Sequence, residues 1–175
     1  WNKKIFKNIQ EKVDLASKTL AEERGPCPDA ADYGINERFS NKTAIAPTAS
    51  ISIICGGSSP GIEPIAANSY THKTLSGSFN VRNKYLKKVL KKYNKDTDEV
   101  WSTITTNQGS VSHLDFLTAD EKDTFKTAFE IDQRWIVELG ADRTPHISQA
   151  QSINVFVPAD IHKKELHDIH FQAWK

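Results

Sequence analysis

The sequence predicts an α/β fold, because segments with helical periodicity alternate with short apolar segments that are typical of β-strands. Helices are predicted over 5–20, 83–93, 118–140 and 158–175, and strands over 43–46 and 152–157. The segment 71–81, which Gly77 interrupts, favours neither structure. We find no internal repeat or low-complexity tract in the sequence, and we expect a single unit over residues 1–175.

The first helix is predicted by apolar residues that recur at helical spacing among lysines and glutamates. These apolar residues are Ile5, Phe6, Ile9, Val13, Ala16 and Leu20. Gly25 and Pro26 end the helix, because glycine tolerates the left-handed cap and proline cannot continue a helix. Residues 26–40 are a predicted loop, and the strand over 43–46 ends at Pro47.

The helix predicted over 83–93 has an apolar face and a strongly basic face. Its apolar stripe comprises Tyr85, Leu86, Val89, Leu90 and Tyr93. Its lysines are Lys84, Lys87, Lys88, Lys91, Lys92 and Lys95. A solvated helix face is favoured over a patch for a polyanion, because no aromatic residue interleaves on the charged side.

The helix predicted over 118–140 has the clearest start signal. Thr118 and Glu121 have the spacing of a capping box, in which each side chain satisfies a backbone donor of the other, and Gly140 is the stop. The predicted buried stripe comprises Phe125, Ala128, Phe129, Trp135, Ile136 and Leu139. The strand over 152–157 follows, and Pro158 opens the last helix.

The composition indicates one soluble globular unit. Of the 175 residues 38% are hydrophobic and 26% are charged, and 23 basic against 22 acidic residues give a net charge of +1. This balance argues against a DNA-binding protein, which would carry a basic excess. The apolar runs are too short to span a bilayer, and no signal-peptide pattern is present. We therefore expect a cytoplasmic protein without a membrane partner.

Neither cysteine nor histidine predicts a metal site. Cys27 and Cys55, the only cysteines, are interpreted as reduced thiols without a catalytic role. His167 and His170 lie three residues apart and could share a helix face, but they lack the spacing of a zinc protease helix. Packing or surface histidines are favoured over metal ligands.

Both ends of the chain suggest a fragment. The sequence contains no methionine, and it stops within a predicted helix with no glycine, asparagine or proline to end it. We therefore expect residues 1–175 to be one piece of a larger domain, truncated at both ends.

The strand-to-turn transition after Pro47 is the sharpest candidate site. Small and hydroxylic residues follow the proline, so a ligand can approach the backbone, and successive N–H groups can bind an anion. From this local pattern alone, an ordinary capped turn is favoured over a ligand site. The glycine-rich segment 56–61 contains Pro60 and no following lysine, which excludes a nucleotide-binding P-loop.

Several motifs, in order along the chain, resemble the large subunit of class I ribonucleotide reductases. The first is Ala-Ile-Ala-Pro-Thr-Ala-Ser-Ile-Ser over 44–52 with Gly-Ile-Glu-Pro over 61–64. The others are Leu75-Ser76-Gly77-Ser78-Phe79 with Asn83 and Leu86, Asn107-Gln108-Gly109-Ser110-Val111, Gln149-Ala150-Gln151-Ser152-Ile153-Asn154 and His170-Phe171-Gln172-Ala173-Trp174-Lys175. The resemblance covers nearly the whole chain and is least distinctive over the first ~40 residues.

The resemblance implies a specific fold, reaction and site. The fold would be part of a ten-stranded α/β barrel. The reaction would be the radical reduction of ribonucleoside diphosphates to deoxyribonucleoside diphosphates, in which a cysteine pair supplies two electrons. The segment that follows Pro47 would hold the substrate phosphates through backbone N–H groups and hydroxyls. Carried over by position, the phosphate contacts are Thr48, Ala49, Ser50, Ile51 and Ser52.

The departures from the family pattern are equally informative. The Asn-x-Cys-x-Glu motif of the radical cysteine is absent, and so is the Tyr-Tyr pair expected about ten residues after Trp174-Lys175. The chain would therefore contain no catalytic residue and have no turnover alone, and it would bind no cofactor of its own. The resemblance also implies a small subunit with a radical-generating metal cofactor and a dithiol reductant. The sites for allosteric ATP and deoxynucleotides would lie in the remainder of the large subunit, outside this chain.

Other interpretations stay open at this point. The chain could be a stand-alone nucleotide-binding or phosphate-binding module, or one piece of a split reductase gene. Within the reductases, a cobalamin-dependent class II enzyme is the alternative to class I. A downstream Tyr-Tyr pair would discriminate, because only the class that needs a separate radical-generating subunit uses it.

Overall fold

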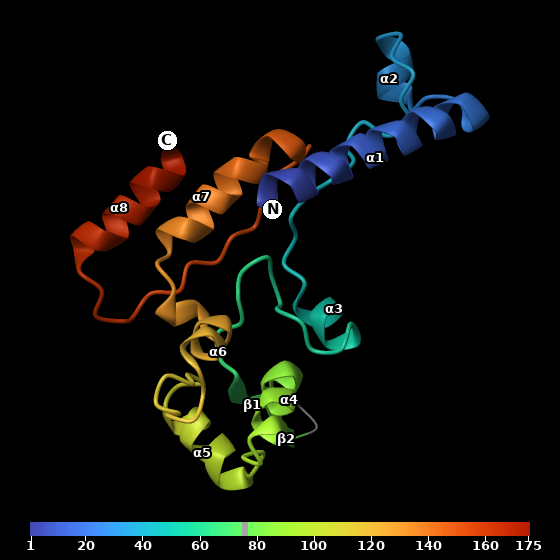
Figure 1. Ribbon diagram of the computed structural model, residues 1–175. Helices are drawn as coiled ribbons and strands as arrows, with labels where there is room; N and C mark the ends of the chain where they lie inside the picture. The colour runs from blue at the N-terminus through green and yellow to red at the C-terminus, as the bar shows by residue number, and fades with distance from the viewer. Residues whose placement is uncertain (75–76) are drawn as a thin grey trace. The chain divides into compact units, whose positions relative to one another are not determined.

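The computed structural model describes residues 1–74 and 77–175, which form two compact units. Unit 1 comprises residues 1–47, 134–153 and 162–175, and unit 2 comprises 48–133 and 154–161. The predicted family motif at 75–79 falls partly outside the described residues, because it includes Leu75 and Ser76. Figure 1 shows the elements of both units along the chain.

Unit 1 consists of helices. They are α1 (Asn2–Arg24), α2 (Pro28–Asp32), α7 (Arg134–Arg143), the 3₁₀ turn η2 (Thr144–His146) and α8 (Lys163–Trp174). Helix α7 packs against both α1 and α8 (Figure 1). Between α1 and α7, the Asn2 side-chain amide donates to the Leu139 carbonyl at 2.8 Å, and Lys3 pairs with Asp142 at 3.0 Å.

The first predicted helix is confirmed, and its predicted stop is confirmed too, since the N–H of Gly25 donates to the carbonyl of Ala21. The apolar stripe is only partly covered, because Ile5 and Ile9 are exposed. The last helix starts at Lys163, after His162 has capped it, rather than at Pro158.

The two predicted strands are not formed as such. Residues 43–46 contribute a single parallel bridge, between Ile45 and Gln151. Backbone bonds from Gln149 N–H to the Thr43 carbonyl and from Ser152 N–H to the Ile45 carbonyl extend this pairing. Within the part of the chain that the structure describes, no strand pairs with segment 152–157, so the strand predicted there is wrong.

Beyond Ser152, two N–H groups of that segment bind side chains instead. The N–H of Asn154 donates to the carboxylate of Glu63, and the N–H of Phe156 donates to Oε1 of Gln133 at 2.8 Å. Buried side chains thus satisfy the backbone donors that a neighbouring strand would otherwise satisfy.

Unit 2 combines short helices with one hairpin. Its elements are α3 (Ala49–Ile54), β1 (Ser69–Thr74), β2 (Gly77–Arg82), α4 (Lys84–Lys92), α5 (Asp98–Thr106), α6 (Ala119–Thr124) and the 3₁₀ turn η1 (Ala128–Glu130). Its apolar core consists of Leu86, Leu90, Trp101, Ile104, Val111, Leu114 and Leu117. The helix predicted over 83–93 is confirmed, and its lysines are exposed.

The hairpin occupies the segment for which the sequence favoured no structure. Strands β1 and β2 pair antiparallel, from Ser69 opposite Arg82 to Thr74 opposite Gly77. Asn68 precedes β1 and is fully buried; its backbone carbonyl accepts from the N–H of Asn83, which follows β2, at 2.8 Å. The partial ten-stranded barrel implied by the resemblance is not tested by this two-stranded sheet and stays a prediction.

The helix predicted over 118–140 is wrong in its length. The predicted capping box of Thr118 and Glu121 is confirmed, but α6 ends at Thr124, and α7 begins only at Arg134. Between them the carboxylate of Glu130 accepts the N–H and hydroxyl of Thr127, which starts the separate turn η1. The predicted stripe is therefore divided between the two units, with Ala128 and Ile136 buried and Phe129, Trp135 and Leu139 exposed.

Among the described residues, no helix is both long enough and apolar enough to cross a membrane.

Candidate functional site

The predicted phosphate segment starts a short helix in unit 2. Thr48 is the N-cap of α3, and Ala49, Ser50 and Ile51 are its first three residues. The backbone N–H groups of these three residues have no helical carbonyl within reach, because an α-helix pairs each N–H with the carbonyl four residues earlier. Ser50 and Ile51 are exposed. The first turn thus presents adjacent donors at an accessible surface, which is the arrangement that binds anions.

Ser52 differs from its neighbours. It is buried, its hydroxyl donates to the carbonyl of Ala49 at 2.7 Å, and its N–H donates to the carbonyl of Thr48 at 2.7 Å. Both of its donors are therefore engaged within α3. The predicted contact of Ser52 with phosphate stays a prediction, and it would require the hydroxyl to leave Ala49.

The N-terminal end of the segment is held by the loop that follows α3. The N–H of Thr48 donates to the carbonyl of Pro60 at 2.9 Å. Within the same loop, the Ser59 hydroxyl donates to the backbone carbonyl of Glu63 at 2.6 Å. The Glu63 side chain is buried, and its carboxylate accepts the N–H of Asn154. Through these bonds Asn154, Glu63 and Pro60 restrain the start of α3.

The C-terminal end of α3 forms a glycine cap. The N–H of Gly57 donates to the Ser52 carbonyl at 2.9 Å, and the N–H of Gly56 donates to the Ile53 carbonyl at 3.1 Å. These two bonds are those of a Schellman motif. Gly56 and Gly57 have φ values of 85° and 76°, a left-handed conformation that glycine adopts without strain.

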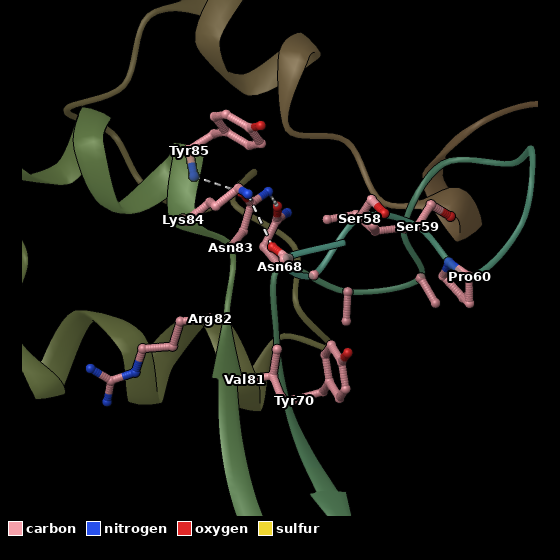
Figure 2. A pocket seen from close by; sticks show the side chains of 15 residues that line it. Ser58, Ser59, Pro60, Asn68, Tyr70, Val81, Arg82, Asn83, Lys84 and Tyr85 are labelled. Atoms are coloured by element: carbon pink, nitrogen blue, oxygen red, sulfur yellow. Dashed lines mark hydrogen bonds between the residues drawn. The ribbon is translucent and has the colours of Figure 1, made fainter. Parts of the chain in front are cut away.

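A cavity of about 790 Å³ borders this cap. It is lined by residues 56–60 and 65–68, by Tyr70 and the end of β2 in the hairpin, and by Lys84 and Tyr85 at the start of α4 (Figure 2). The Lys84 ammonium donates to the carbonyl of Gly56 at 3.0 Å and lies 5.2 Å from the centre of the Tyr85 ring. Arg82, which also lines the cavity, pairs with Asp98 at 2.8 Å.

A second cavity of about 570 Å³ in unit 2 has both polar and apolar side chains in its lining, and Glu130 lies in its wall. Burial raises the pKa of this carboxyl, but hydrogen bonds from the Ser110 hydroxyl and from the N–H and hydroxyl of Thr127 outweigh that effect. The net result is a pKa below the usual value, so Glu130 is a stable anion at neutral pH. Its acceptors are occupied by these neighbours, which indicates a structural role.

The two histidines of α8 are exposed and make contacts within their own helix. His170 Nδ1 lies 2.8 Å from the carbonyl of Leu166, and the His167 ring stacks on Phe171 with 5.8 Å between centres. Over residues 1–74 and 77–175, the structure groups no three histidine, cysteine or acidic side chains as metal ligands would be. Cys27 and Cys55 are free thiols.

Comparison with known proteins gives this geometry a context. The family described as the barrel domain of ribonucleotide reductase matches residues 29–175, most of the chain. The chain belongs to the ribonucleotide reductase family. This confirms the resemblance inferred from the ordered motifs, including the segment that forms α3.

Individual ribonucleotide reductases agree. The large subunit of ribonucleoside-diphosphate reductase from Invertebrate iridescent virus 6 is 47% identical over 175 residues, which cover 98% of this chain and 18% of that protein. The corresponding subunit of Invertebrate iridescent virus 3 is 46% identical over 99% of this chain and 28% of that protein. A class Id ribonucleotide reductase alpha subunit from Actinobacillus ureae has a TM-score of 0.87 at 38% identity, covering 99% of this chain and 31% of that one. The chain thus spans less than a third of the length of these reductases.

Two other reductase motifs, at 107–111 and 149–154, contain residues that hold the backbone of their own unit in place. Gly109 approaches Ala67 and Asn68 so closely that a Cβ at this position would collide with both. Gln151 donates from its side-chain amide to the carbonyl of Gly140 at 3.0 Å, and its Oε1 accepts from Arg143 at 2.6 Å. These motif residues thus have structural roles in the units that contain them.

Sequence reasoning missed four residues that organise unit 2: Glu63, Asn68, Asn83 and Lys84. In the sequence, Glu63 is marked only by the Gly-Ile-Glu-Pro motif, and Asn83 by its place beside the Leu-Ser-Gly motif and at the start of the helix predicted over 83–93. Asn83 carried a usable signal, because asparagine just before an apolar-periodic segment is a common N-cap, and its side chain indeed accepts from the N–H of Tyr85 at 2.9 Å. No local pattern identifies partners 15 to 91 residues away, as for Asn68–Asn83 and Glu63–Asn154.

Proposed function

We propose that this chain is part of the large subunit of a class I ribonucleotide reductase and supplies the segment that holds the substrate diphosphate. The proposed contacts are Thr48, Ala49, Ser50, Ile51 and Ser52. The observation that carries the proposal is the first turn of α3, where adjacent backbone donors and the exposed Ser50 lie in the segment that resembles the family's phosphate-binding segment.

The chemistry of the proposed site is recognition rather than catalysis. A diphosphate offers several anionic acceptors, and backbone N–H groups in a fixed turn bind them without the entropy loss of ordering long side chains. Ser50 can add a hydroxyl donor to the same anion. The bonds from Thr48 to Pro60 and from Gly57 to Ser52 hold these donors in place before the substrate arrives, which favours binding.

The remaining parts of the reaction are proposed to come from elsewhere. The radical would originate at a metal cofactor in a small partner subunit, and a dithiol would provide the electrons. The radical cysteine, the reducing cysteines and the allosteric sites for ATP and deoxynucleotides would belong to other parts of the large subunit. This chain would contribute binding and orientation of the ribonucleoside diphosphate, in the cytoplasm and in support of DNA replication.

The test uses a complete large subunit. The matching segment of the Invertebrate iridescent virus 6 protein is replaced by this chain, and reduction of CDP and ADP is measured with that virus's small subunit. Circular dichroism and small-subunit binding check that the chimera is folded and assembled. We expect turnover that depends on the small subunit. A folded, assembled chimera without turnover contradicts the class I assignment.

The phosphate site is tested by Ser50→Asp in the same chimera. A carboxylate in the first turn of a helix favours the helix, but it repels a bound diphosphate. We therefore expect the KM for CDP to rise by roughly tenfold or more, with thermal stability unchanged or slightly increased. Ser102→Asp, on the exposed face of α5, is the matched control and should leave KM unchanged. Equal KM values for the two variants would contradict the assignment of Thr48 to Ser52.

A further inference from the structure

Lys84 connects two elements that belong to different parts of unit 2. It is the first residue of α4, and its ammonium donates to the carbonyl of Gly56 at 3.0 Å. Gly56 is the left-handed residue that ends α3. A cation at the C-terminal end of a helix also interacts favourably with the partial negative charge of its last carbonyls. The side chain therefore restrains the end of α3 opposite to the proposed phosphate donors.

The base of this restraint is rigid. Asn83 caps α4 through its side-chain oxygen, and its amide donates to Oδ1 of Asn68 at 2.8 Å (Figure 2). Asn68 is buried, and its own amide donates to the carbonyls of Gly109 and Phe125 at 3.0 and 2.7 Å. The backbone from which Lys84 extends is thus tied to the interior of unit 2.

We propose that Lys84 is a positioning residue for the substrate phosphate segment. It acts through Gly56: the bond fixes the glycine cap, the cap fixes the C-terminal end of α3, and the six-residue helix transmits the restraint to Ala49, Ser50 and Ile51. A helix of this length has too few internal hydrogen bonds to be stable alone, so its geometry depends on what holds its ends. This inference rests on the proposed function of α3.

Two other roles for the lysine charge make different predictions. Lys88 also lies near the Tyr85 ring, 5.9 Å from its centre, and it carries the same charge on the same helix. Among the described residues that line the cavity beside Gly56, Lys84 is present and Lys88 is not. If the effect came from ring contact or from general attraction of an anion, Lys88→Met would resemble Lys84→Met. A positioning role of Lys84 instead predicts an effect of Lys84→Met and no effect of Lys88→Met.

The experiment compares Lys84→Met, Lys84→Arg and Lys88→Met in the chimeric large subunit. Steady-state kinetics give KM and kcat for CDP, and hydrogen–deuterium exchange follows the amides of Gly56 and Gly57 and, separately, those of α4. For Lys84→Met we expect about a threefold rise in KM and a kcat within about twofold of the parent value, because a single exposed charge-assisted bond is lost. Amide exchange should be faster at Gly56 and Gly57 and unchanged in α4. Lys84→Arg should restore both readouts, and Lys88→Met should match the parent.

Three results would overturn the proposal. They are unchanged exchange at Gly56 and Gly57 in Lys84→Met, an equal rise in KM in Lys88→Met, and an unchanged KM in Lys84→Met. The failure of the underlying function has a separate signature. If Ser50→Asp leaves KM unchanged, the phosphate assignment fails, whereas a raised KM in Ser50→Asp with a normal KM in Lys84→Met rejects the role of Lys84 alone.

Discussion

The side-chain amide of Asn83 donates to the side-chain oxygen of Asn68 at 2.8 Å, and this bond closes the β1–β2 hairpin at its open end. Asn68 directly precedes β1, and Asn83 directly follows β2 and caps α4. One buried residue therefore connects the hairpin, the start of α4 and the backbone at Gly109 and Phe125.

Asn68→Ala should strongly destabilise unit 2. The substitution leaves the Phe125 carbonyl and the Asn83 amide without this partner in a buried site, which costs about 2–3 kcal/mol. Native-state hydrogen exchange of the buried amides in α4 and α5 measures the loss. Asn80→Ala, on the exposed part of β2, is the control and should change stability by less than about 0.5 kcal/mol. Equal effects of the two substitutions would show that the buried network is unimportant.

Gly109→Ala should be more harmful than Gly34→Ala. Both glycines have positive φ, at 82° and 67°, so alanine is strained at either position by about 1–2 kcal/mol. Only at Gly109 would the new Cβ collide with Ala67 and Asn68; around Gly34 there is open space. We expect Gly109→Ala to lower the free energy of unfolding by at least about 1 kcal/mol more than Gly34→Ala does. Hydrogen exchange of buried amides, in the unit that carries each glycine, measures this loss. A smaller loss of stability in Gly109→Ala would mean that the backbone at Gly109 can move away from Ala67 and Asn68.

The capping box at α6 predicts a pH dependence. The Thr118 N–H lowers the pKa of Glu121 below 4.5, and bonds from the Tyr93 hydroxyl and the Thr118 hydroxyl add to this against the opposing effect of burial. Because the folded-state pKa is depressed, the stabilisation is present above the unfolded pKa and is lost as pH falls through the folded value. Carboxyl NMR titration should show Glu121 titrating below 4.5. Thr118→Ala should raise that pKa, and an unchanged value would reject the capping bond as its cause.

Ser52→Ala and Ser50→Ala should differ in stability. The Ser52 hydroxyl is buried and bonded to Ala49, so its removal should cost about 1 kcal/mol and speed exchange of the α3 amides. The Ser50 side chain is exposed, so Ser50→Ala should leave that exchange unchanged. If Ser52→Ala exchanges like the parent while diphosphate affinity falls, Ser52 acts on the ligand rather than on the helix.

Local signals in the sequence predicted the helix boundaries that depend on local bonds. Gly25 and the Thr118–Glu121 pair act through neighbours within a few residues, and both predictions are confirmed. The break after Thr124 had the same kind of signal, because Thr127 and Glu130 repeat the capping-box spacing. The prediction of one helix over 118–140 follows the apolar stripe that includes Phe125 and Ala128 and does not use this second signal.

Predictions that depend on distant partners failed for a physical reason. An apolar extended segment such as 152–157 becomes a strand only where another backbone lies alongside it, and here Glu63 and Gln133 take that place. The hairpin was unrecognised because β2 is exposed along most of its length, which removes the alternation of apolar and polar residues. Of the site, the sequence could indicate the phosphate motif, whereas its supports at Pro60, Glu63 and Lys84 depend on the folded chain.

The unequal burial of the four tryptophans provides an optical probe. Trp101 is 1% exposed in the core of unit 2, where its ring nitrogen donates to Asp96 at 2.8 Å. Trp1, Trp135 and Trp174, all in unit 1, are 95%, 56% and 79% exposed. Acrylamide or iodide will therefore quench the red-shifted emission of the three exposed rings and leave a blue-shifted residual from Trp101. That residual reports on the unit that contains α3, without any introduced label.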